Sequence, residues 1–398
     1  MKILFFLNDV RFVNSFGGVE LVACSFANEF VNRGNDVTIV CNNPENGRPV
    51  RPLNPKVRLI NLNGSGRKKR YVPFYIELLR GILWPLRKTF PGKSLDSWRQ
   101  ELKQKKIAKL LNPILQEDPP DLILSFFNEG LTTLYYSSAA DSVPIIQMFH
   151  STPSRAIRYK SRILSRMLCR CEAVQVLQPE FVSELDEYGP LNIEVIPNAV
   201  EFPLEKIDYK DKRNGRIICL GRLEPGKRQH LLIDSFLQVA KDFPDWTLHF
   251  FGEARKHYFK RLKNRIPAEM IRRQIFFEET TQESQKELLS SDIFGFPSAF
   301  EGFPLALCEA MALGLPALGF QNAPGINSLI VDNENGFLAS DRDDYTEKLR
   351  LLMKNAALRR RLGERGKESM QQYAPEKIWN QWDELFQNIL AKKARTIK

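Results

Sequence analysis

A short loop at residues 218–230, ICLGRLEPGKRQH, combines glycines and cations in a pattern that could bind phosphate. Gly221 is followed by four residues, a second glycine and Lys227, which is the skeleton of a nucleoside-triphosphate P-loop. The next residue is Arg228, where a P-loop requires a Ser or Thr hydroxyl for magnesium. ATP or GTP hydrolysis is therefore not expected. Two interpretations remain: a metal-independent diphosphate site built on Arg222 and Lys227, and an exposed basic turn.

Two glutamates in residues 297–314, PSAFEGFPLALCEAMALG, form a second candidate site. Glu301 precedes a predicted helix, and Glu309 lies two turns inside that helix among small apolar residues. A carboxylate in apolar surroundings needs hydrogen-bonding partners, and it can accept from two sugar hydroxyls at once. Gly302 permits close backbone approach just before the helix. The segment predicts sugar binding, with a partly exposed helical glutamate as the alternative.

His150 and a D-x-D sequence are further candidates for chemistry. His150 is the last residue of the apolar run PIIQMFH, so we expect it to close a buried strand and point into a ligand cleft. Without further evidence, a histidine at a strand end more often has a structural role than a catalytic one. Asp341 and Asp343 could hold a metal ion, but they precede the helical segment YTEKLRLL, and helix capping is the favoured interpretation.

Length and composition indicate a globular protein of two domains. The chain has 398 residues, 43% hydrophobic and 26% charged, which is enough for two cores. Because no run of eighteen uncharged apolar residues occurs, no transmembrane helix is expected, and the start MKILFFLNDV is interpreted as a buried strand. Six scattered cysteines with only four histidines predict buried thiols and no structural zinc.

Short apolar runs alternate with helical segments along both halves of the chain. The expected strands are residues 2–8, 36–42, 56–63, 121–127, 144–150 and 173–178, and then 216–221, 246–252, 275–279, 292–298, 316–320 and 335–340. Continuous apolar runs of this length are typical of parallel strands buried on both faces. Apolar periodicity lapses at residues 197–215, which predicts a linker. The pattern indicates an α/β fold of two doubly wound domains, with a ligand cleft at the carboxyl ends of the strands.

Together, GRLEPGK and PSAFEGFPLALCEAMALGLP resemble the C-terminal half of GT-B-fold glycosyltransferases of family 4, the retaining, nucleotide-sugar-dependent enzymes among the glycosyl transferases group 1. GGVE at 17–20, IPNAVE at 196–201 and NGFLA at 335–339 extend the resemblance over nearly the whole chain. It implies two Rossmann-like domains facing a central cleft. Residues 1–203 would bind the acceptor, residues 204–374 the nucleotide-sugar donor, and a helix at 375–398 would cross back to pack on the N-terminal domain.

The resemblance also implies a role for each matching residue. Arg222 and Lys227 are expected to contact the donor diphosphate, Glu309 the ribose hydroxyls, and Glu301 the region of the donor sugar. His150 is expected to contact the reacting sugar, so that His150, Glu301, Arg222 and Lys227 form the catalytic group. The remaining expected members are the main-chain N–H groups of Gly302, Phe303 and Leu305 on the donor side, and Gly17, Gly18 and Glu20 on the cleft or acceptor side.

The implied reaction is transfer of a sugar, as in a hexosyltransferase, from a nucleoside-diphosphate sugar to a glycan or lipid-linked glycan with retention. UDP is the expected nucleotide, and cell-surface polysaccharide or lipopolysaccharide synthesis the expected setting. No covalent nucleophile stands out, so a front-face displacement is favoured, and neither cofactor nor metal is expected. Two alternatives share the fold: a catalytically silent GT-B subunit that binds nucleotide or glycan, and a GT-B sugar-nucleotide epimerase.

The formal net charge of the whole chain is +11, and basic residues are concentrated in its first half. From Gly66 to Leu110 there are thirteen Lys or Arg against three Asp or Glu, and residues 71–90 add aromatic side chains. The arginines expected to share one helix face are Arg155, Arg158, Arg162, Arg166 and Arg170. Such segments favour an anionic membrane surface, with solvated basic helices as the alternative, and no nucleic-acid motif accompanies them. The expected location is cytoplasmic, peripheral on the inner face of the membrane.

Overall fold

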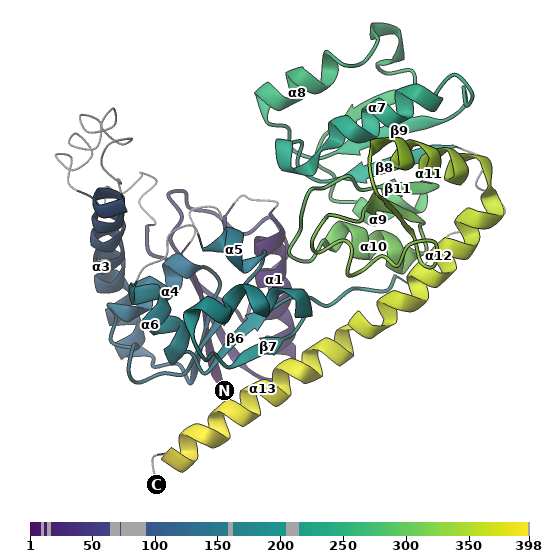
Figure 1. The fold of residues 1–398 in the computed structure, drawn as a ribbon. Coiled ribbons are helices and arrows are strands. Elements are labelled where there is room, and N and C mark those ends of the chain that lie inside the picture. The colour runs from purple at the N-terminus through teal and green to yellow at the C-terminus, as the bar shows by residue number, and fades with distance from the viewer. Residues whose placement is uncertain are drawn as a thin grey trace. The chain divides into compact units, whose positions relative to one another are not determined.

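The computed structural model describes residues 1–8, 12–13, 17–63, 72, 93–157, 162–203 and 215–396, with only the backbone described at 93–98 and 396. The chain divides into two compact units whose elements are labelled in Figure 1. Unit 1 comprises Met1–Ile196 together with Gln387–Lys398, and unit 2 comprises Pro197–Phe386. Helix α13 (Pro375–Thr396) therefore contributes residues to both units.

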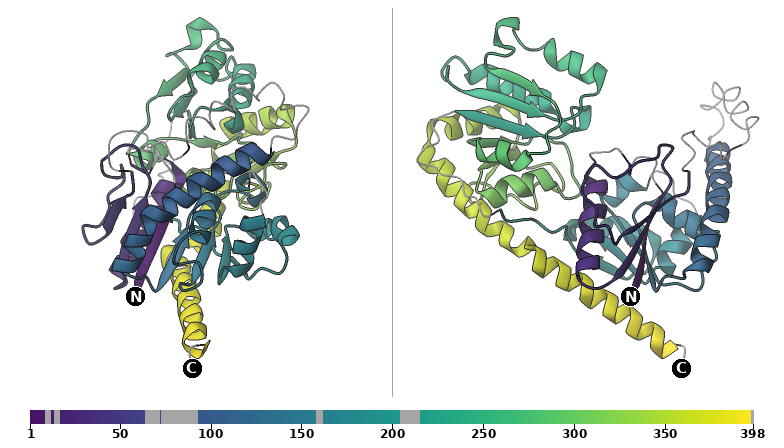
Figure 2. Two further views of the ribbon diagram at one scale, coloured as in Figure 1. Left: turned by 90° about the vertical axis from the view of Figure 1, so that its left-hand side faces the viewer. Right: turned by 180° about the vertical axis from the view of Figure 1, so that it is seen from behind.

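Unit 1 is built on a seven-stranded sheet of order β3-β2-β1-β4-β5-β6-β7, in which every neighbouring pair is parallel. The strands are β1 (Lys2–Leu7), β2 (Asp36–Cys41), β3 (Arg58–Asn61), β4 (Leu122–Ser125), β5 (Ile145–Met148), β6 (Ala173–Val176) and β7 (Ile193–Val195). The helices and turns are α1 (Gly18–Asn32), α3 (Lys93–Glu117), α4 (Asn128–Tyr135), α5 (Pro153–Ala156), α6 (Arg162–Arg170), η2 (Pro179–Phe181) and η3 (Ser183–Tyr188). Figures 1 and 2 show α1 on one face of this sheet and α3, α4 and α6 on the other.

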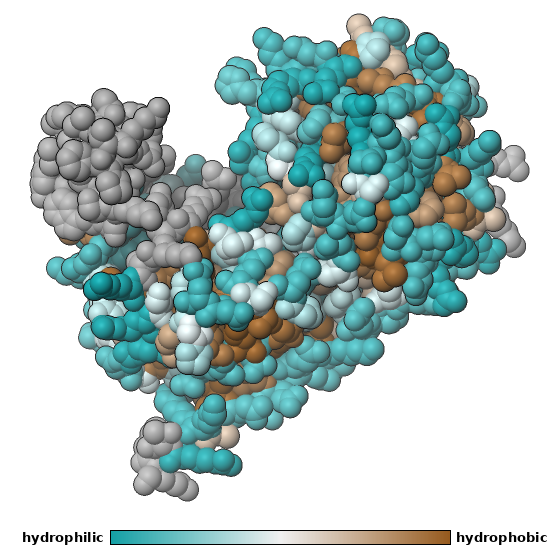
Figure 3. Space-filling model, in the orientation of Figure 1, coloured by the Kyte–Doolittle hydropathy of each residue, from teal (hydrophilic) through white to brown (hydrophobic). Residues whose placement is uncertain are grey.

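Unit 2 repeats this topology with a six-stranded parallel sheet of order β10-β9-β8-β11-β12-β13. The strands are β8 (Arg216–Leu220), β9 (Thr247–Phe251), β10 (Ile275–Glu278), β11 (Ile293–Gly295), β12 (Ala317–Phe320) and β13 (Phe337–Ala339). The helices and turns are η4 (Pro225–Lys227), α7 (Gln229–Val239), α8 (Lys256–Lys263), η5 (Ala268–Met270), α9 (Ser284–Leu289), α10 (Leu305–Leu313), α11 (Arg342–Lys354), α12 (Ala356–Met370) and η6 (Gln371–Tyr373). Hydrophilic side chains cover most of unit 2 in the view of Figure 3, with apolar residues between them.

The α/β class and the doubly wound topology expected from the sequence are confirmed in both units. The expected strands form because their apolar runs are buried, as in β4, β5, β6 and β12, whose residues are all buried. β7 was not expected, because its three residues include a glutamate and are only partly buried. In each sheet the strand order reverses next to the first strand, between β1 and β4 and between β8 and β11. Ligands of such sheets bind at that point, beyond the carboxyl ends of the strands.

One expectation about the basic segments is wrong, and others concern residues outside the described part of the chain. The arginines after His150 do not share one helix, because Arg155 lies in α5 whereas Arg162, Arg166 and Arg170 lie in α6. On α6 the residues Leu164, Met167 and Leu168 are buried. Residues 64–71 and 73–92, Arg158 and the central part of the expected linker, 204–214, lie outside the described residues.

Candidate functional site

The loop after β8 turns sharply at the edge of the unit 2 sheet. Gly221 follows the strand with φ of 140°, in the region that favours glycine. Arg222 then has an exposed side chain, and the short turn η4 brings Lys227 to a half-buried position. Arg228 adopts the left-handed conformation, with φ of 49° and ψ of 29°, and is the N-cap of α7. It therefore redirects the chain at the position where a P-loop holds its magnesium-binding hydroxyl.

Lys227 and Glu301, which the sequence separates by 74 positions, form an ion pair. Lys227 Nζ lies 2.5 Å from Glu301 Oε1, and Ser298 Oγ donates to the same oxygen at 2.6 Å. Both charged side chains are largely buried, with 22% and 14% of their surface exposed. Lys227 follows β8 and Glu301 follows β11, so the pair sits where the strand order reverses. The structure thus joins the two motifs at the expected ligand position.

Glu224 and Gln229 orient Arg222, and neither was anticipated from the sequence. The Glu224 carboxylate lies 3.2 Å from Arg222 Nη2 and 2.7 Å from Arg255 Nη2. Gln229 is buried, and its Nε2 donates to the main-chain oxygen of Arg222 at 2.9 Å. These roles depend on neighbours across the turn, so no motif or periodicity marks them in the sequence.

The turns after β8 and β9 pack backbone against backbone. Gly252 has φ of 147°, and a Cβ at this position would overlap the main-chain oxygen of Gly221. The N–H of Gly221 donates to the oxygen of Phe251 at 3.0 Å, and the N–H of Leu223 donates to the oxygen of Glu253 at 2.8 Å. Gly252 therefore permits the close approach that supports the loop carrying Arg222.

Helix α10 begins at Leu305, shortly after Glu301. Pro304 is its N-cap, and no side chain forms a capping hydrogen bond with its first N–H groups. Gly302 and Phe303 are buried immediately before it, and the helix starts at Leu305. Glu309 is half-buried, more than one turn farther along. A helix N-terminus in this place favours a negatively charged ligand group.

Unit 1 has its own cavity, of about 400 Å³, at the carboxyl ends of β1, β4 and β5. Asn8 lines it after β1, Phe126 and Phe127 after β4, and His150 after β5. Val19, in the first turn of α1, completes this side of the wall. The cavity lies at the point where the strand order reverses, which is the ligand position of a doubly wound sheet.

His150 lies at this cavity, but β5 ends at Met148, so the expectation that His150 closes the strand is corrected by two residues. Its ring stacks on Phe126, with 5.0 Å between the centroids and 17° between the planes. Neither ring nitrogen has a hydrogen-bond partner among the described residues. Burial lowers the pKa of His150 to about 3, so the imidazole is neutral near pH 7 and can donate one hydrogen bond to a ligand.

The first turn of α1 borders the same cavity. Gly17 is the N-cap of α1, Gly18 is its first residue and Glu20 lies in its first turn. A Cβ at Gly17 would overlap the Glu20 carboxylate, so glycine leaves room for this side chain to fold back over the helix start. Of the three expected residues none lines the cavity itself, whereas their neighbour Val19 does.

A buried polar network ties the end of β1 to the helices beside the cavity. Asn8 Nδ2 donates to Gln104 Oε1 at 2.9 Å and to Thr133 Oγ1 at 3.0 Å. Gln104 belongs to α3 and Thr133 to α4, so one asparagine joins three elements. The sequence contains no motif that marks this network, because Asn8 lies 96 positions from Gln104 and 125 positions from Thr133.

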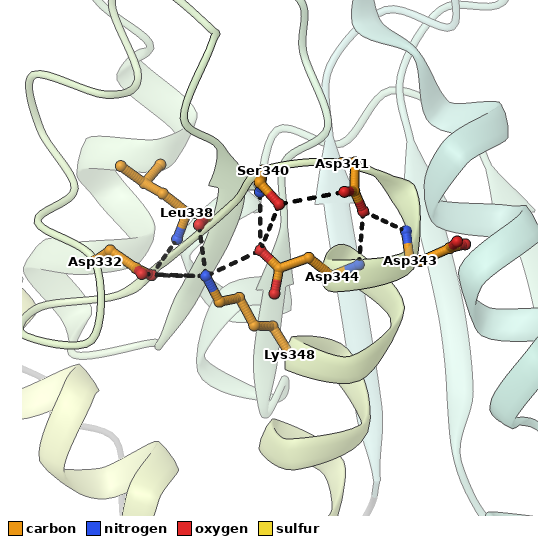
Figure 4. Close-up of polar contacts among 7 residues, drawn as sticks. All are labelled: Asp332, Leu338, Ser340, Asp341, Asp343, Asp344 and Lys348. Atoms are coloured by element: carbon orange, nitrogen blue, oxygen red, sulfur yellow. Dashed lines mark hydrogen bonds and ion pairs between the residues drawn. The ribbon is translucent and has the colours of Figure 1, made fainter.

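The D-x-D sequence is a helix cap, as expected (Figure 4). Asp341 Oδ1 accepts hydrogen bonds from the N–H groups of Asp343 and Asp344, each at 2.9 Å, at the start of α11. Lys348 lies 3.2 Å from Asp344 and 3.1 Å from Asp332. In the described part of the chain no group of three or more His, Cys, Asp or Glu side chains is placed to hold a metal ion. Nor does any described helix have the length and hydropathy needed to span a membrane.

Comparison with known proteins agrees with this geometry. Residues 204–369 match the model of the family described as glycosyl transferases group 1. The chain is 25% identical over 389 residues to an uncharacterised glycosyltransferase of Haemophilus influenzae, covering 96% of this chain and 98% of the relative. It is 29% identical over 176 residues to the UDP-Gal:α-D-GlcNAc-diphosphoundecaprenol α-1,3-galactosyltransferase of Escherichia coli, covering 40% of this chain and 45% of that one.

Among solved structures, sucrose-phosphate synthase from Thermosynechococcus elongatus superimposes with a TM-score of 0.78 at 15% identity, covering 98% of this chain and 99% of the other. Two Rossmann-like units with this likeness define the GT-B class of fold, which confirms the fold expected from the sequence. Residues 204–369 therefore match the glycosyl transferases group 1, and the comparisons indicate a glycosyltransferase enzyme.

Proposed function

We propose that this glycosyltransferase moves a hexose-type sugar from a nucleoside-diphosphate sugar, with UDP as the nucleotide, to a hydroxyl of a glycan or lipid-linked glycan, with retention. Its setting would be cell-surface polysaccharide or lipopolysaccharide synthesis. The observation that carries the proposal is the Lys227–Glu301 pair beside Arg222, at the strand-order reversal of unit 2. The Escherichia coli relative is a UDP-Gal:α-D-GlcNAc-diphosphoundecaprenol galactosyltransferase, which supports the proposed donor and acceptor classes.

In this proposal the donor lies along the carboxyl ends of β8 and β11. Arg222 and Lys227 neutralise the diphosphate, because fixed cations can replace a metal ion there. The N–H groups at Gly302, Phe303 and the start of α10 donate hydrogen bonds to a further phosphate or sugar oxygen. Glu301 holds donor-sugar hydroxyls, and Glu309 holds the ribose hydroxyls.

The reaction follows as a front-face displacement. The bond between the anomeric carbon and the diphosphate oxygen breaks, and negative charge grows on the leaving phosphate beside Arg222 and Lys227. The acceptor oxygen bonds to the same face of the anomeric carbon, and its proton passes to the leaving phosphate. The nearby Cys219 is not suited to act as a covalent nucleophile, because burial raises the pKa of its thiol to about 12.

Unit 1 would supply the acceptor side. In this proposal the neutral imidazole of His150, which lines the unit 1 cavity, donates a hydrogen bond to a hydroxyl of the reacting sugar. Gly17, Gly18 and Glu20 shape the adjoining helix start. The capping role of Asp341 leaves the D-x-D sequence without a metal function, and we propose that the reaction needs no metal.

The test is incubation of the full chain with a panel of labelled nucleotide sugars, with release of nucleoside diphosphate as the readout. One donor should be consumed faster than the others, and the product should keep the anomeric configuration of that donor. An inverted product would refute the retaining mechanism. Full activity in EDTA is expected, and activity restored only by a divalent cation would refute metal independence.

We further propose that α6 helps to hold the enzyme on an anionic membrane. Arg162 and Arg166 are exposed on α6, whereas Arg170 forms an ion pair with Asp141. Each exposed cation near an anionic surface contributes about 1 kcal/mol. Replacing Arg162 and Arg166 by Gln should weaken binding to phosphatidylserine-containing vesicles about 30-fold. Unchanged binding would show that α6 is a solvated basic helix.

A further inference from the structure

The unit 1 cavity gathers polar groups that lack partners. In the described part of the chain twelve buried side-chain nitrogen or oxygen atoms have no hydrogen-bond partner. Five of the twelve belong to cavity-lining residues: Oε1 of Gln100, Oδ1 of Asn128, Oε1 of Gln147, and both ring nitrogens of His150. Buried polar groups in folded proteins are almost always satisfied, so this concentration indicates a ligand with several hydrogen-bonding groups.

Gln147 gives the clearest evidence for a ligand in this cavity. It lies in β5, is fully buried, and its Nε2 donates to the main-chain oxygen of Met148 at 2.9 Å, which leaves Oε1 unpartnered at the cavity. Three of the five unpartnered atoms are amide oxygens, which accept hydrogen bonds from hydroxyl groups. The cavity volume of about 400 Å³ falls within the range of about 300–1,000 Å³ that is usual for small-molecule sites. A hydroxyl-rich ligand such as a saccharide fits these features.

Of the residues that the structure describes, two basic side chains and one acidic side chain line the same cavity. Lys103 from α3 and Arg155 from α5 both line it. The N-terminus of α4, at Asn128, also borders the cavity and has no side-chain cap, so its N–H groups add positive potential. Glu129 is the one acidic residue among the lining residues of the described chain, and His150 is neutral. The balance is positive, which a neutral sugar would not require.

We propose that this cavity binds an acceptor saccharide bearing an anionic group, either a phosphate or a carboxylate, which Lys103 and Arg155 hold while the amides of Gln100, Asn128 and Gln147 bind its hydroxyls. The inference rests on the proposed function, because it names the acceptor class of that reaction. Lys103 and Arg155 are then determinants of acceptor specificity, supplied by helices that flank the sheet.

Three probes with one sugar ring test the charge preference: glucose 1-phosphate, methyl glucuronide and methyl glucoside. Their binding to the full chain is measured by calorimetry, and unfolding midpoints are measured in parallel. At least one anionic probe should bind more tightly than the neutral glucoside. The tighter of the two anionic probes identifies phosphate or carboxylate as the group.

Substitutions inside and outside the cavity test whether the probes bind there. Lys103→Met and Arg155→Gln should each weaken the favoured anionic probe about tenfold or more, the usual effect of losing a hydrogen bond to a charged group. Lys106→Met removes an exposed charge from the same helix without touching the cavity, and it should leave binding unchanged. Lys227→Met, in unit 2, should also leave it unchanged, which excludes binding of the probe at the proposed donor site.

Gln147→Met separates a ligand-binding role from a structural one. It should weaken the charged and neutral probes alike, while the unfolding midpoint stays equal or rises, because a buried unpartnered oxygen is removed. A lowered midpoint with unchanged binding would show that Gln147 is structural and would overturn its assignment.

Equal affinity for charged and neutral rings, no binding of any probe, or a Lys103→Met variant that matches Lys106→Met would overturn the proposal. These outcomes are distinct from failure of the proposed function. If a nucleotide sugar is consumed but the anionic preference is absent, only the acceptor inference fails. If the probes bind as expected but no nucleotide sugar is consumed, only the proposed function fails.

Discussion

Replacing Lys227 by Met tests the pair that carries the proposed donor site. The substitution keeps most of the side-chain volume and removes the charge, leaving Glu301 with Ser298 Oγ at 2.6 Å as the partner of its Oε1. Glu301 is 14% exposed, so its carboxylate is only partly solvated once the cation is gone. We expect the free energy of unfolding to fall by about 1–3 kcal/mol, the usual range for a polar group left without its partner.

The expected loss of activity is larger than the loss of stability. Lys227 lies beside the position proposed for the leaving diphosphate, where charge grows during the reaction. Removing one such preorganised group costs about 100–1,000-fold in rate, equivalent to about 2.7–4 kcal/mol. The assay is the initial rate of nucleoside diphosphate release at a temperature where circular dichroism shows that the variant is fully folded.

Lys286→Met is the matched control. Lys286 forms a surface pair with Glu283 at 3.4 Å and is 76% exposed, so its loss should cost less than about 1 kcal/mol and leave the rate unchanged. A folded Lys227→Met variant that loses less than tenfold in rate would refute the assignment of Lys227 to the diphosphate. Equal losses in both variants would show that the effect is not local.

The remaining predictions concern pH, capping and close backbone approach. Burial lowers the pKa of His150 to about 3, so below about pH 6.5 the unfolded chain binds a proton that the folded chain does not. Acidification from pH 6.5 toward 4 should therefore destabilise the wild type more than His150→Gln, by up to about 1.4 kcal/mol per pH unit. Parallel curves of stability against pH for the two proteins would contradict this. Asp341→Ala should lower the free energy of unfolding by about 0.5–2 kcal/mol without changing the rate per folded molecule, and a lost rate restored by added metal would refute the capping role. Gly252→Ala should destabilise by at least about 1–2 kcal/mol in a denaturant titration, because φ of 147° disfavours a Cβ and the Cβ meets the Gly221 carbonyl; an unchanged midpoint would show that the turns can separate.

Local patterns predicted much of the fold, because the features concerned depend on near neighbours in the chain. Buried parallel strands need continuous apolar runs, and the runs at residues 2–8 and 316–320 became β1 and β12. Asp341 was recognised as a cap because a cap lies within three residues of the N–H groups it accepts from. β7 was not predicted, because its short, half-buried sequence has no clear apolar pattern.

Features that depend on distant residues were not predictable in this way. The single basic helix expected after His150 is broken into α5 and α6, so Arg155 turns out to line the unit 1 cavity while Arg166 lies exposed on α6. Glu224 and Gln229, which orient Arg222, carry no motif because their partners are set by the fold of the turn.

Local sequence was enough to predict the order of most strands, the glycine turns, and the kinds of side chain that stand at strand ends. Hydrophobic burial acts on residue type and spacing, and both can be read along the chain. Tertiary structure alone decided that Lys227 meets Glu301 across 74 positions, and that Lys103, Gln147 and His150 surround one cavity. The reason is physical: parallel strands from distant segments end at a common edge, and only their order in the sheet determines which ends are neighbours.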